Sequence, residues 1–258
     1  MKKVLIICLL FTGIAAATAA TIRIEKHVGE VAEGYNYWLV YPADTLEAKP
    51  VVLFLHGASL CGNQMERVKR YGPIHAVEHG REIDAYIIAP QNPGGSWRPA
   101  KVKRVLDCVK ERCNIDSTRV YVVGMSLGGY GTIDFAAAYP DEVAAAVAIC
   151  GGGTAQNLSV LHRVPLWLIH GTEDRAVSVR ESDRIAEAIK QVDSTASRLI
   201  YDRVSDMNHS QPTRIFYLPE LYEWLFLHKL TEEERPVHET VHIDPVLLQR
   251  AYRGLVWH

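Results

Sequence analysis

Apolar runs and amphipathic stretches alternate along most of the chain. Residues 35–41 alternate between apolar and polar positions and predict an early strand. Six further runs predict buried strands, at residues 51–55, 85–89, 120–124, 145–150, 165–170 and 198–204, and the run at 51–55 is apolar without alternation, as expected for a strand buried on both faces. Helical stretches lie between them. This order predicts one α/β domain with a mostly parallel, twisted sheet and a functional site at the carboxyl ends of the strands.

The N-terminus predicts export of the protein. Lys2 and Lys3 precede an apolar stretch at residues 4–17, and the small residues at 17–19 follow it, which is typical of a secretory signal peptide. We expect cleavage near Ala19 or Ala20 and a periplasmic or secreted protein without a membrane anchor. The expected division is a signal peptide at residues 1–19, the main domain at 20–230 and a C-terminal extension at 231–258.

The C-terminal extension is expected to be a polar linker followed by a short amphipathic helix at residues 245–252. Its apolar side chains would pack on the core or on a second copy of the chain, which leaves a homodimer open. These side chains are Val246, Leu247, Leu248, Tyr252, Leu255 and Trp257.

The net charge limits the classes of binding partner, and the cysteine content limits the possible disulfide bonds. The formal net charge is −2, and loss of Lys2 and Lys3 with the signal peptide takes it to −4. We therefore expect no nucleic acid or anionic membrane as a partner. Outside the signal peptide the cysteines are Cys61, Cys108, Cys113 and Cys150. A short disulfide between Cys108 and Cys113 is an alternative to free structural thiols, which we favour.

The segment at residues 121–131 carries the strongest chemical signal. It reads Tyr-Val-Val-Gly-Met-Ser-Leu-Gly-Gly-Tyr-Gly, an apolar run leading through Gly124, Ser126 and Gly128 into a helix-like stretch. A serine on such a sharp strand-to-helix turn is a nucleophile elbow, and the glycines are needed because side chains there would collide with neighbouring elements. Ser126 is therefore the candidate nucleophile.

An acid and a base follow in the order that this elbow requires. The strand at residues 165–170 ends in a polar turn that contains Glu173 and Asp174, and Asp174 is the candidate acid. Asp206 is the rival acid, because it lies close in sequence to the candidate base. That base is His209, which is the only histidine between the strand at residues 198–204 and the next helix.

The run at residues 51–55 opens into His56, Gly57, Ala58 and Ser59. In this kind of site, one oxyanion donor comes from the residue after the nucleophile and the other from the loop after this early strand. The candidate donors are therefore the amides of Leu127 and Ala58. His56 is expected to brace the loop. No cofactor is required, since the base activates the nucleophile.

Residues 238–242 match a zinc-binding pattern, His-Glu-x-x-His. Two prolines, Pro236 and Pro245, confine any helix there, and little chain remains to supply a third ligand. We therefore expect no metal site and interpret the segment as part of the linker.

With these motifs in place, residues 35–227 resemble the α/β-hydrolase fold. Within it the chain is similar to secreted bacterial esterases of the dienelactone hydrolase, feruloyl esterase and prolyl oligopeptidase-like "predicted peptidase" types. Residues 56–57, 124–128 and 171–174 carry most of the resemblance. Asn208 departs from it, where many relatives have glycine, and so does the stretch at residues 60–63.

The resemblance implies a serine esterase that acts through an acyl-enzyme on an acyl or feruloyl ester, either a small molecule or one linked to polysaccharide. It also implies that the loop at residues 89–97 lines the acyl pocket, with Trp97 and Gln91 as substrate-binding residues. Two alternatives remain open: a prolyl oligopeptidase-like serine peptidase and a non-catalytic binding protein on the same scaffold.

Overall fold

A computed structural model describes residues 22–238 and 240–257, and within them one eight-stranded sheet has the order β1-β2-β4-β3-β5-β6-β7-β8. Its strands are β1 (Ile24–His27), β2 (Asn36–Val40), β3 (Lys49–Leu55), β4 (Tyr86–Gln91), β5 (Ile115–Met125), β6 (Ala145–Ile149), β7 (Leu166–Gly171) and β8 (Leu199–Val204). β2 pairs antiparallel with β1 and β4, and the other neighbours are parallel. The predicted mostly parallel sheet is confirmed.

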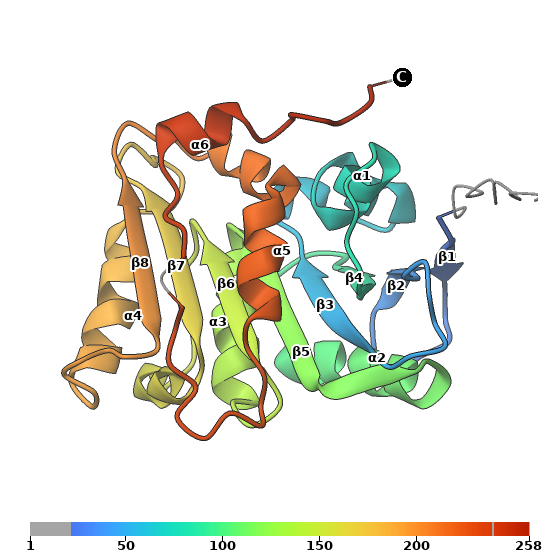
Figure 1. The fold of residues 1–258 in the computed structure, drawn as a ribbon, viewed down its shortest axis with the longest axis horizontal. Helices are drawn as coiled ribbons and strands as arrows, with labels where there is room; N and C mark the ends of the chain where they lie inside the picture. Colours follow the sequence, from blue (N-terminus) through green and yellow to red (C-terminus); the bar gives the residue numbers. More distant parts are fainter. Residues whose placement is uncertain (1–21, 239, 258) are drawn as a thin grey trace, which may run out of the picture.

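Helices cover both faces of the sheet (Figure 1). They are α1 (Pro73–Glu78), α2 (Pro99–Arg112), α3 (Leu127–Ala138), α4 (Arg180–Lys190), α5 (Pro219–Phe226) and α6 (Pro245–Gln249), with short 3₁₀ segments η1 (Ala58–Leu60), η2 (Met65–Arg70), η3 (Leu158–Arg163) and η4 (Gln211–Tyr217). Successive side chains of a strand point to opposite faces. Leu53 therefore packs in the layer of α2, α3 and α4, whereas Phe54 packs in the layer of α1, α5 and α6.

Two element predictions need correction. β1 was not predicted, because its four residues, Ile-Glu-Lys-His, carry more charge than apolar surface. β1 pairs along the edge of β2, and β2 is buried on both faces after its first residue because Trp38 and Leu39 pack in the cores on opposite sides of the sheet. The C-terminal helix is shorter than expected, since α6 ends at Gln249 and turns follow it.

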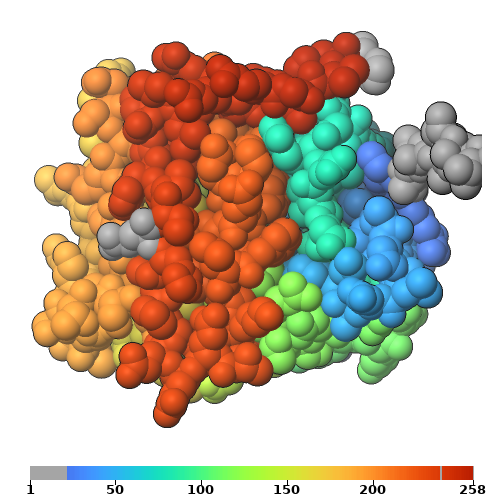
Figure 2. Space-filling view, in the orientation of Figure 1, coloured from blue at the N-terminus to red at the C-terminus, as the bar shows by residue number. Residues whose placement is uncertain are grey.

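The C-terminal segment, residues 231–257, crosses the molecule beside α5 and ends near α1 (Figures 1 and 2). Arg235 anchors its start by donating to the backbone oxygens of Val143 and Ala144. At its end the backbone N–H of Val256 donates to the oxygen of His79 at 2.9 Å. Its expected apolar residues behave differently from one another: Leu248 is buried, whereas Val246, Tyr252 and Trp257 remain 57%, 39% and 51% exposed.

Parallel strands end at one edge of the sheet, and the elbow lies there because two glycines allow close packing. A Cβ on Gly124 would lie 2.3 Å from the oxygen of Gly128, and a Cβ on Gly128 would lie 1.7 Å from the oxygen of Leu55. Real Cβ atoms do not approach backbone so closely. The prediction that side chains at these positions would collide with neighbouring elements is therefore confirmed.

We expect Gly128→Ala to lower the free energy of unfolding by about 3 kcal/mol, since the clash is with β3 backbone that cannot rotate away. Urea unfolding followed by circular dichroism measures this. Gly29→Ala is the matched control: its φ is +72° with open space around it, so only backbone strain of about 1 kcal/mol is expected. Equal losses in the two variants would contradict the packing argument.

Among the described residues, no helix combines the length and apolarity needed to cross a membrane. The predicted signal peptide at residues 1–19 lies outside the described residues. The four cysteines Cys61, Cys108, Cys113 and Cys150 are free thiols in the structure.

Candidate active site

Ser126 stands between the end of β5 and the first residue of α3. Its backbone has φ 58° and ψ −122°, a conformation that a residue other than glycine adopts only when its surroundings hold it there. Two backbone hydrogen bonds hold the turn. The N–H of Ser126 donates to the backbone oxygen of Ile149 at 2.8 Å, and the backbone oxygen of Ser126 accepts from the N–H of Tyr130 at 3.1 Å. The side chain of Ser126 consequently projects at the carboxyl edge of the sheet, where the loops after β7 and β8 also lie.

His209 joins Ser126 to Asp174. Its Nε2 lies 2.9 Å from the Oγ of Ser126, and its Nδ1 lies 2.6 Å from the Oδ2 of Asp174. Because an ionised carboxylate only accepts, Nδ1 carries the proton and the neutral Nε2 accepts from the serine hydroxyl. The three residues come from the ends of β5, β7 and β8, and the structure brings them into one hydrogen-bonded line.

The side chain of Asp174 is completely buried, and hydrogen-bond donors stabilise its charge. Its Oδ1 accepts from the N–H groups of Ala176 and Val177, each at 2.9 Å, and its Oδ2 accepts from His209. Burial alone raises the pKa of Asp174, but these hydrogen bonds outweigh burial and hold the pKa below its ordinary value. The carboxylate is therefore ionised when His209 takes up a proton.

The other acids near His209 have different surroundings. Asp206 is exposed, and its backbone N–H donates to the hydroxyl of Thr172. Glu173 is exposed as well. Both line a cavity of about 690 Å³ that is also lined by Arg175, Ala176, Asn208, His209 and Ser210. These groups give the opening beside His209 a polar and charged wall.

The two candidate oxyanion donors each begin a helical segment. Ala58 is the first residue of η1 and Leu127 is the first residue of α3. The N–H of a first helical residue has no acceptor within its own helix, so both amides are available to a substrate oxygen. The loop between β3 and η1 lies against the nucleophile, since a Cβ on Gly57 would be only 3.4 Å from the Cβ of Ser126.

Buried side chains hold this loop in place. The Nδ1 of His56 donates to the oxygen of Gly57 at 2.9 Å, and its Nε2 accepts from the N–H of Asn92 at 3.1 Å. The indole N–H of Trp97 donates to the oxygen of His56 at 3.1 Å. The side-chain amide of Gln91 donates to the oxygens of Leu60 and Gly62. The bracing role expected of His56 thus agrees with its contacts.

Trp97 and Gln91 are each 4% exposed. Their observed contacts support the loop, and their substrate-binding role stays a prediction. The sequence signal for this bracing was weak, because Trp97 is 41 positions from the backbone oxygen it contacts.

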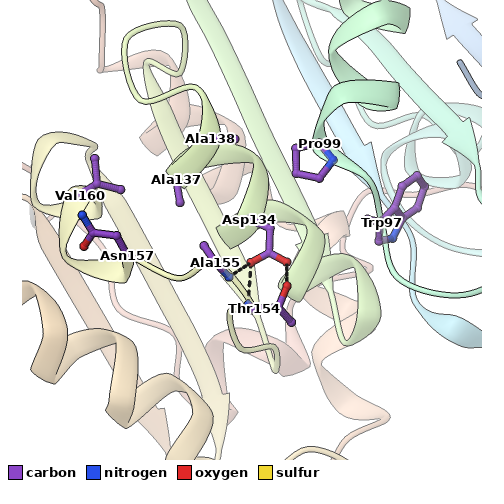
Figure 3. A pocket seen from close by; sticks show the side chains of 9 residues that line it. All are labelled: Trp97, Pro99, Asp134, Ala137, Ala138, Thr154, Ala155, Asn157 and Val160. Carbon is purple, nitrogen blue, oxygen red and sulfur yellow. Dashed lines mark hydrogen bonds between the residues drawn. The ribbon is translucent and has the colours of Figure 1, made fainter. Parts of the chain in front are cut away.

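Trp97 also borders a second cavity of about 430 Å³ beside α3 (Figure 3). The one carboxylate in that cavity's lining, Asp134, already accepts hydrogen bonds from the N–H and hydroxyl of Thr154 and from the N–H of Ala155.

Protonation of His56 should destabilise the protein. Burial lowers the pKa of His56 to about 4 from its ordinary value of 6.5, so the unfolded chain binds a proton first as pH falls. Stability contributed by the neutral ring is present above pH 6.5 and is lost as pH falls through about 4. At 1.36 kcal/mol per unit this amounts to about 3 kcal/mol.

We therefore expect the free energy of unfolding to fall by about 3 kcal/mol less between pH 6.5 and 4 in His56→Gln than in the wild type. Urea titrations at several pH values measure the difference. The same pH dependence in both proteins would contradict the assignment of a buried neutral ring.

The pattern at residues 238–242 does not form the geometry of a zinc site in the described residues. Residues 238 and 240–244 are not helical. The Nδ1 of His242 donates to Asp202 at 2.7 Å, whereas the ring of His238 lies 5.2 Å from the ring of His228. The two histidines therefore serve different contacts that fasten the C-terminal segment.

The sheet order, the strained serine after β5 and the hydrogen-bonded partners after β7 and β8 define the α/β-hydrolase fold, in the form found in esterase-like serine hydrolases. Residues 95–210 match the model of the Dienelactone hydrolase family, and all three members of the hydrogen-bonded line fall within that range. The match to this family therefore covers the segment that carries the candidate chemistry.

Individual relatives agree with this class. The chain is 23% identical over 168 residues, 61% of its length, to a bifunctional acetylxylan esterase/xylanase from Neocallimastix patriciarum. It is 41% identical over 121 residues, 40% of its length, to poly(3-hydroxyalkanoate) depolymerase C from Paucimonas lemoignei. These stretches span 24% and 28% of the two relatives. A thermostable esterase matches in structure with a TM-score of 0.66 at 23% identity, over 81% of this chain and 63% of that one.

Proposed function

We propose that this chain is a serine esterase that cleaves carboxylic esters through a covalent acyl-enzyme. The observation that carries the proposal is the hydrogen-bonded line from Asp174 through His209 to Ser126, beside the helix-start amides of Ala58 and Leu127. A buried carboxylate, an imidazole and a strained serine in this order are the parts that acyl transfer needs.

In the first half of the reaction, the Oγ of Ser126 attacks the ester carbonyl carbon as its proton passes to the Nε2 of His209. The amides of Ala58 and Leu127 stabilise the oxyanion, and Asp174 stabilises the imidazolium. The bond between carbon and the alcohol oxygen then breaks, and the alcohol leaves with the proton from His209. Water repeats the same steps on the acyl-enzyme and releases the acid.

The alcohol part of the substrate is proposed to be hydroxylated, as in an ester carried on polysaccharide. His209 gives its proton to the leaving alcohol, so the groups around His209 face that part of the substrate. The cavity there is lined by charged and polar side chains, including Glu173, Arg175 and Asn208. One relative is an acetylxylan esterase/xylanase, which supports the same substrate class. Because the N-terminus is typical of a signal peptide, we also propose that the protein is exported.

Hydrolysis of a defined panel tests the function. The mature protein is assayed with p-nitrophenyl acyl esters, methyl ferulate, acetylated xylan and a prolyl-amide substrate, with Ser126→Ala as the blank. Preference for ferulate or for acetyl groups on xylan is the expected result. Cleavage of the amide in place of esters would establish a peptidase, and no cleavage together with no fluorophosphonate labelling would indicate a binding protein.

A further inference from the structure

A second polar layer lies behind the candidate acid. The Sγ of Cys150, an oxygen of Asp174 and a ring nitrogen of His209 all lie within 4.8 Å of one another. His170, from β7, places its Nε2 3.6 Å from the Oδ2 of Asp174. Cys150 and His170 are both completely buried. The steps of the proposed ester cleavage assign no role to either side chain.

Cys150 occupies a backbone conformation that favours glycine. Its φ is +45°, in the left-handed region, and three glycines follow it at residues 151–153. A residue other than glycine in this region destabilises the folded state, and the conformation persists only where the surrounding structure enforces it. A glycine at position 150 would relieve the strain but would remove the thiol, which packs in the hydrophobic core and lies within 4.8 Å of Asp174.

The thiol is a protonated hydrogen-bond donor. Burial raises the pKa of Cys150 far above its ordinary value, and this effect outweighs a hydrogen bond with the backbone of Gly171, which lowers it; the charge of the neighbouring Asp174 carboxylate raises the pKa further. A neutral thiol offers one S–H. The buried carboxylate of Asp174 is the acceptor next to it, and that carboxylate otherwise receives only one side-chain hydrogen bond, from His209.

His170 fixes the same turn from the other side. Its Nε2 donates to the oxygen of Val177 at 3.0 Å, and its Nδ1 lies 2.7 Å from the Oγ of Ser182, which supplies a hydroxyl donor. Both ring nitrogens of the neutral imidazole are therefore used. Val177 is also one of the two residues whose N–H groups bind Asp174. His170 thus fixes the backbone of Val177, whose N–H in turn binds the Asp174 carboxylate.

We propose that Cys150 is a positioning residue, whose thiol donates a hydrogen bond to Asp174 and, with His170 behind the turn, fixes the carboxylate in line with His209. This inference rests on the proposed esterase function, since Cys150 acts through Asp174 and touches no substrate. Without the S–H donor, the carboxylate loses a contact on the side facing β6 and turns more freely. Fewer molecules then hold His209 in the productive orientation, which lowers kcat and leaves substrate binding unchanged.

Three substitutions at one position separate the thiol from the backbone. Cys150→Ala and Cys150→Gly remove the donor, whereas Cys150→Ser keeps one. We expect kcat to fall about tenfold in the alanine and glycine variants with KM unchanged, as for loss of a hydrogen bond to a charged group. The serine variant should stay within about threefold of the wild type. Cys113→Ala, at the C-terminal cap of α2, is the matched control and should retain wild-type kcat.

The order of the variants in Tm should differ from their order in kcat, because glycine at position 150 relieves the backbone strain that remains with alanine. We expect Cys150→Gly to have a Tm at least equal to that of Cys150→Ala, although both lose activity. Full kcat in the alanine variant, or a serine variant as slow as alanine, would overturn the proposal. If the alanine variant fails to fold, the comparison of serine with glycine decides in the same way.

A readout without substrate separates this proposal from the function itself. The low-field proton NMR signal of the His209 Nδ1–H, assigned by its absence in His209→Gln, reports the bond to Asp174. We expect the signal to shift or broaden in Cys150→Ala and to remain in Cys150→Ser. An inactive wild type that still shows this difference would refute the esterase and keep the positioning role, whereas an unchanged signal in all variants of an active enzyme would refute the positioning role alone.

Discussion

Ser126→Ala should lower the rate of ester hydrolysis at least about a thousandfold and abolish labelling by a fluorophosphonate. The variant keeps the amides of Ala58 and Leu127 but has no oxygen to attack the carbonyl. His209 would then face a methyl group at the position where it now accepts a hydrogen bond at 2.9 Å. Initial rates on a p-nitrophenyl ester, measured against the uncatalysed reaction, give the loss directly.

The fold should survive this change. Ser126 has φ 58°, so Ser126→Gly should be as inactive as the alanine variant yet more stable by about 1 kcal/mol, because glycine adopts this backbone without strain. Ser159→Ala, at a half-buried serine of η3, is the matched control and should keep full activity. Residual activity in Ser126→Ala above about one hundredth of the wild type would assign the nucleophile elsewhere.

The sequence was informative wherever one local rule decides the structure. Buried parallel strands need continuous apolar runs, and each of the six predicted runs lies on an observed strand. The elbow needs glycine on either side of Ser126, and Gly124 and Gly128 have no space for a Cβ. Because parallel strands share one edge, motifs after β5, β7 and β8 had to lie near one another. Local pattern and topology together were therefore enough for the fold and for the arrangement of Ser126, Asp174 and His209.

The sequence was less informative where a contact joins distant segments through buried polar atoms. The resemblance to esterases predicts that Trp97 lines the acyl pocket, but it gave no sign that the indole N–H reaches back 41 residues to the loop at His56. Nothing local distinguishes such a bracing tryptophan from one that faces a substrate. The position of the Cys150 thiol within 4.8 Å of Asp174 is similar, since it depends on the positive φ at the end of β6 and on the register of β6 with β7.

Asp174→Asn should lower kcat by about ten thousandfold with little change in fold, because it reverses the polarity of one hydrogen bond. The side-chain oxygen of asparagine must continue to accept from the N–H groups of Ala176 and Val177, as Oδ1 does now. Its NH₂ group then faces the Nδ1 of His209. Two donors cannot bond each other, so the ring keeps its proton on Nε2 and cannot accept one from Ser126.

The control for this prediction is the neighbouring acid that the sequence left as a rival. Asp206 is exposed, and among the described residues only its backbone N–H makes a hydrogen bond, to the hydroxyl oxygen of Thr172. Asp206→Asn should therefore change kcat by less than about threefold. Steady-state kinetics of both variants on one ester make the comparison, with circular dichroism to show that each is folded. A large loss in Asp206→Asn with a small loss in Asp174→Asn would transfer the role of the acid to Asp206. The reverse result would show that the buried carboxylate, with its two backbone donors, sets the tautomer of His209.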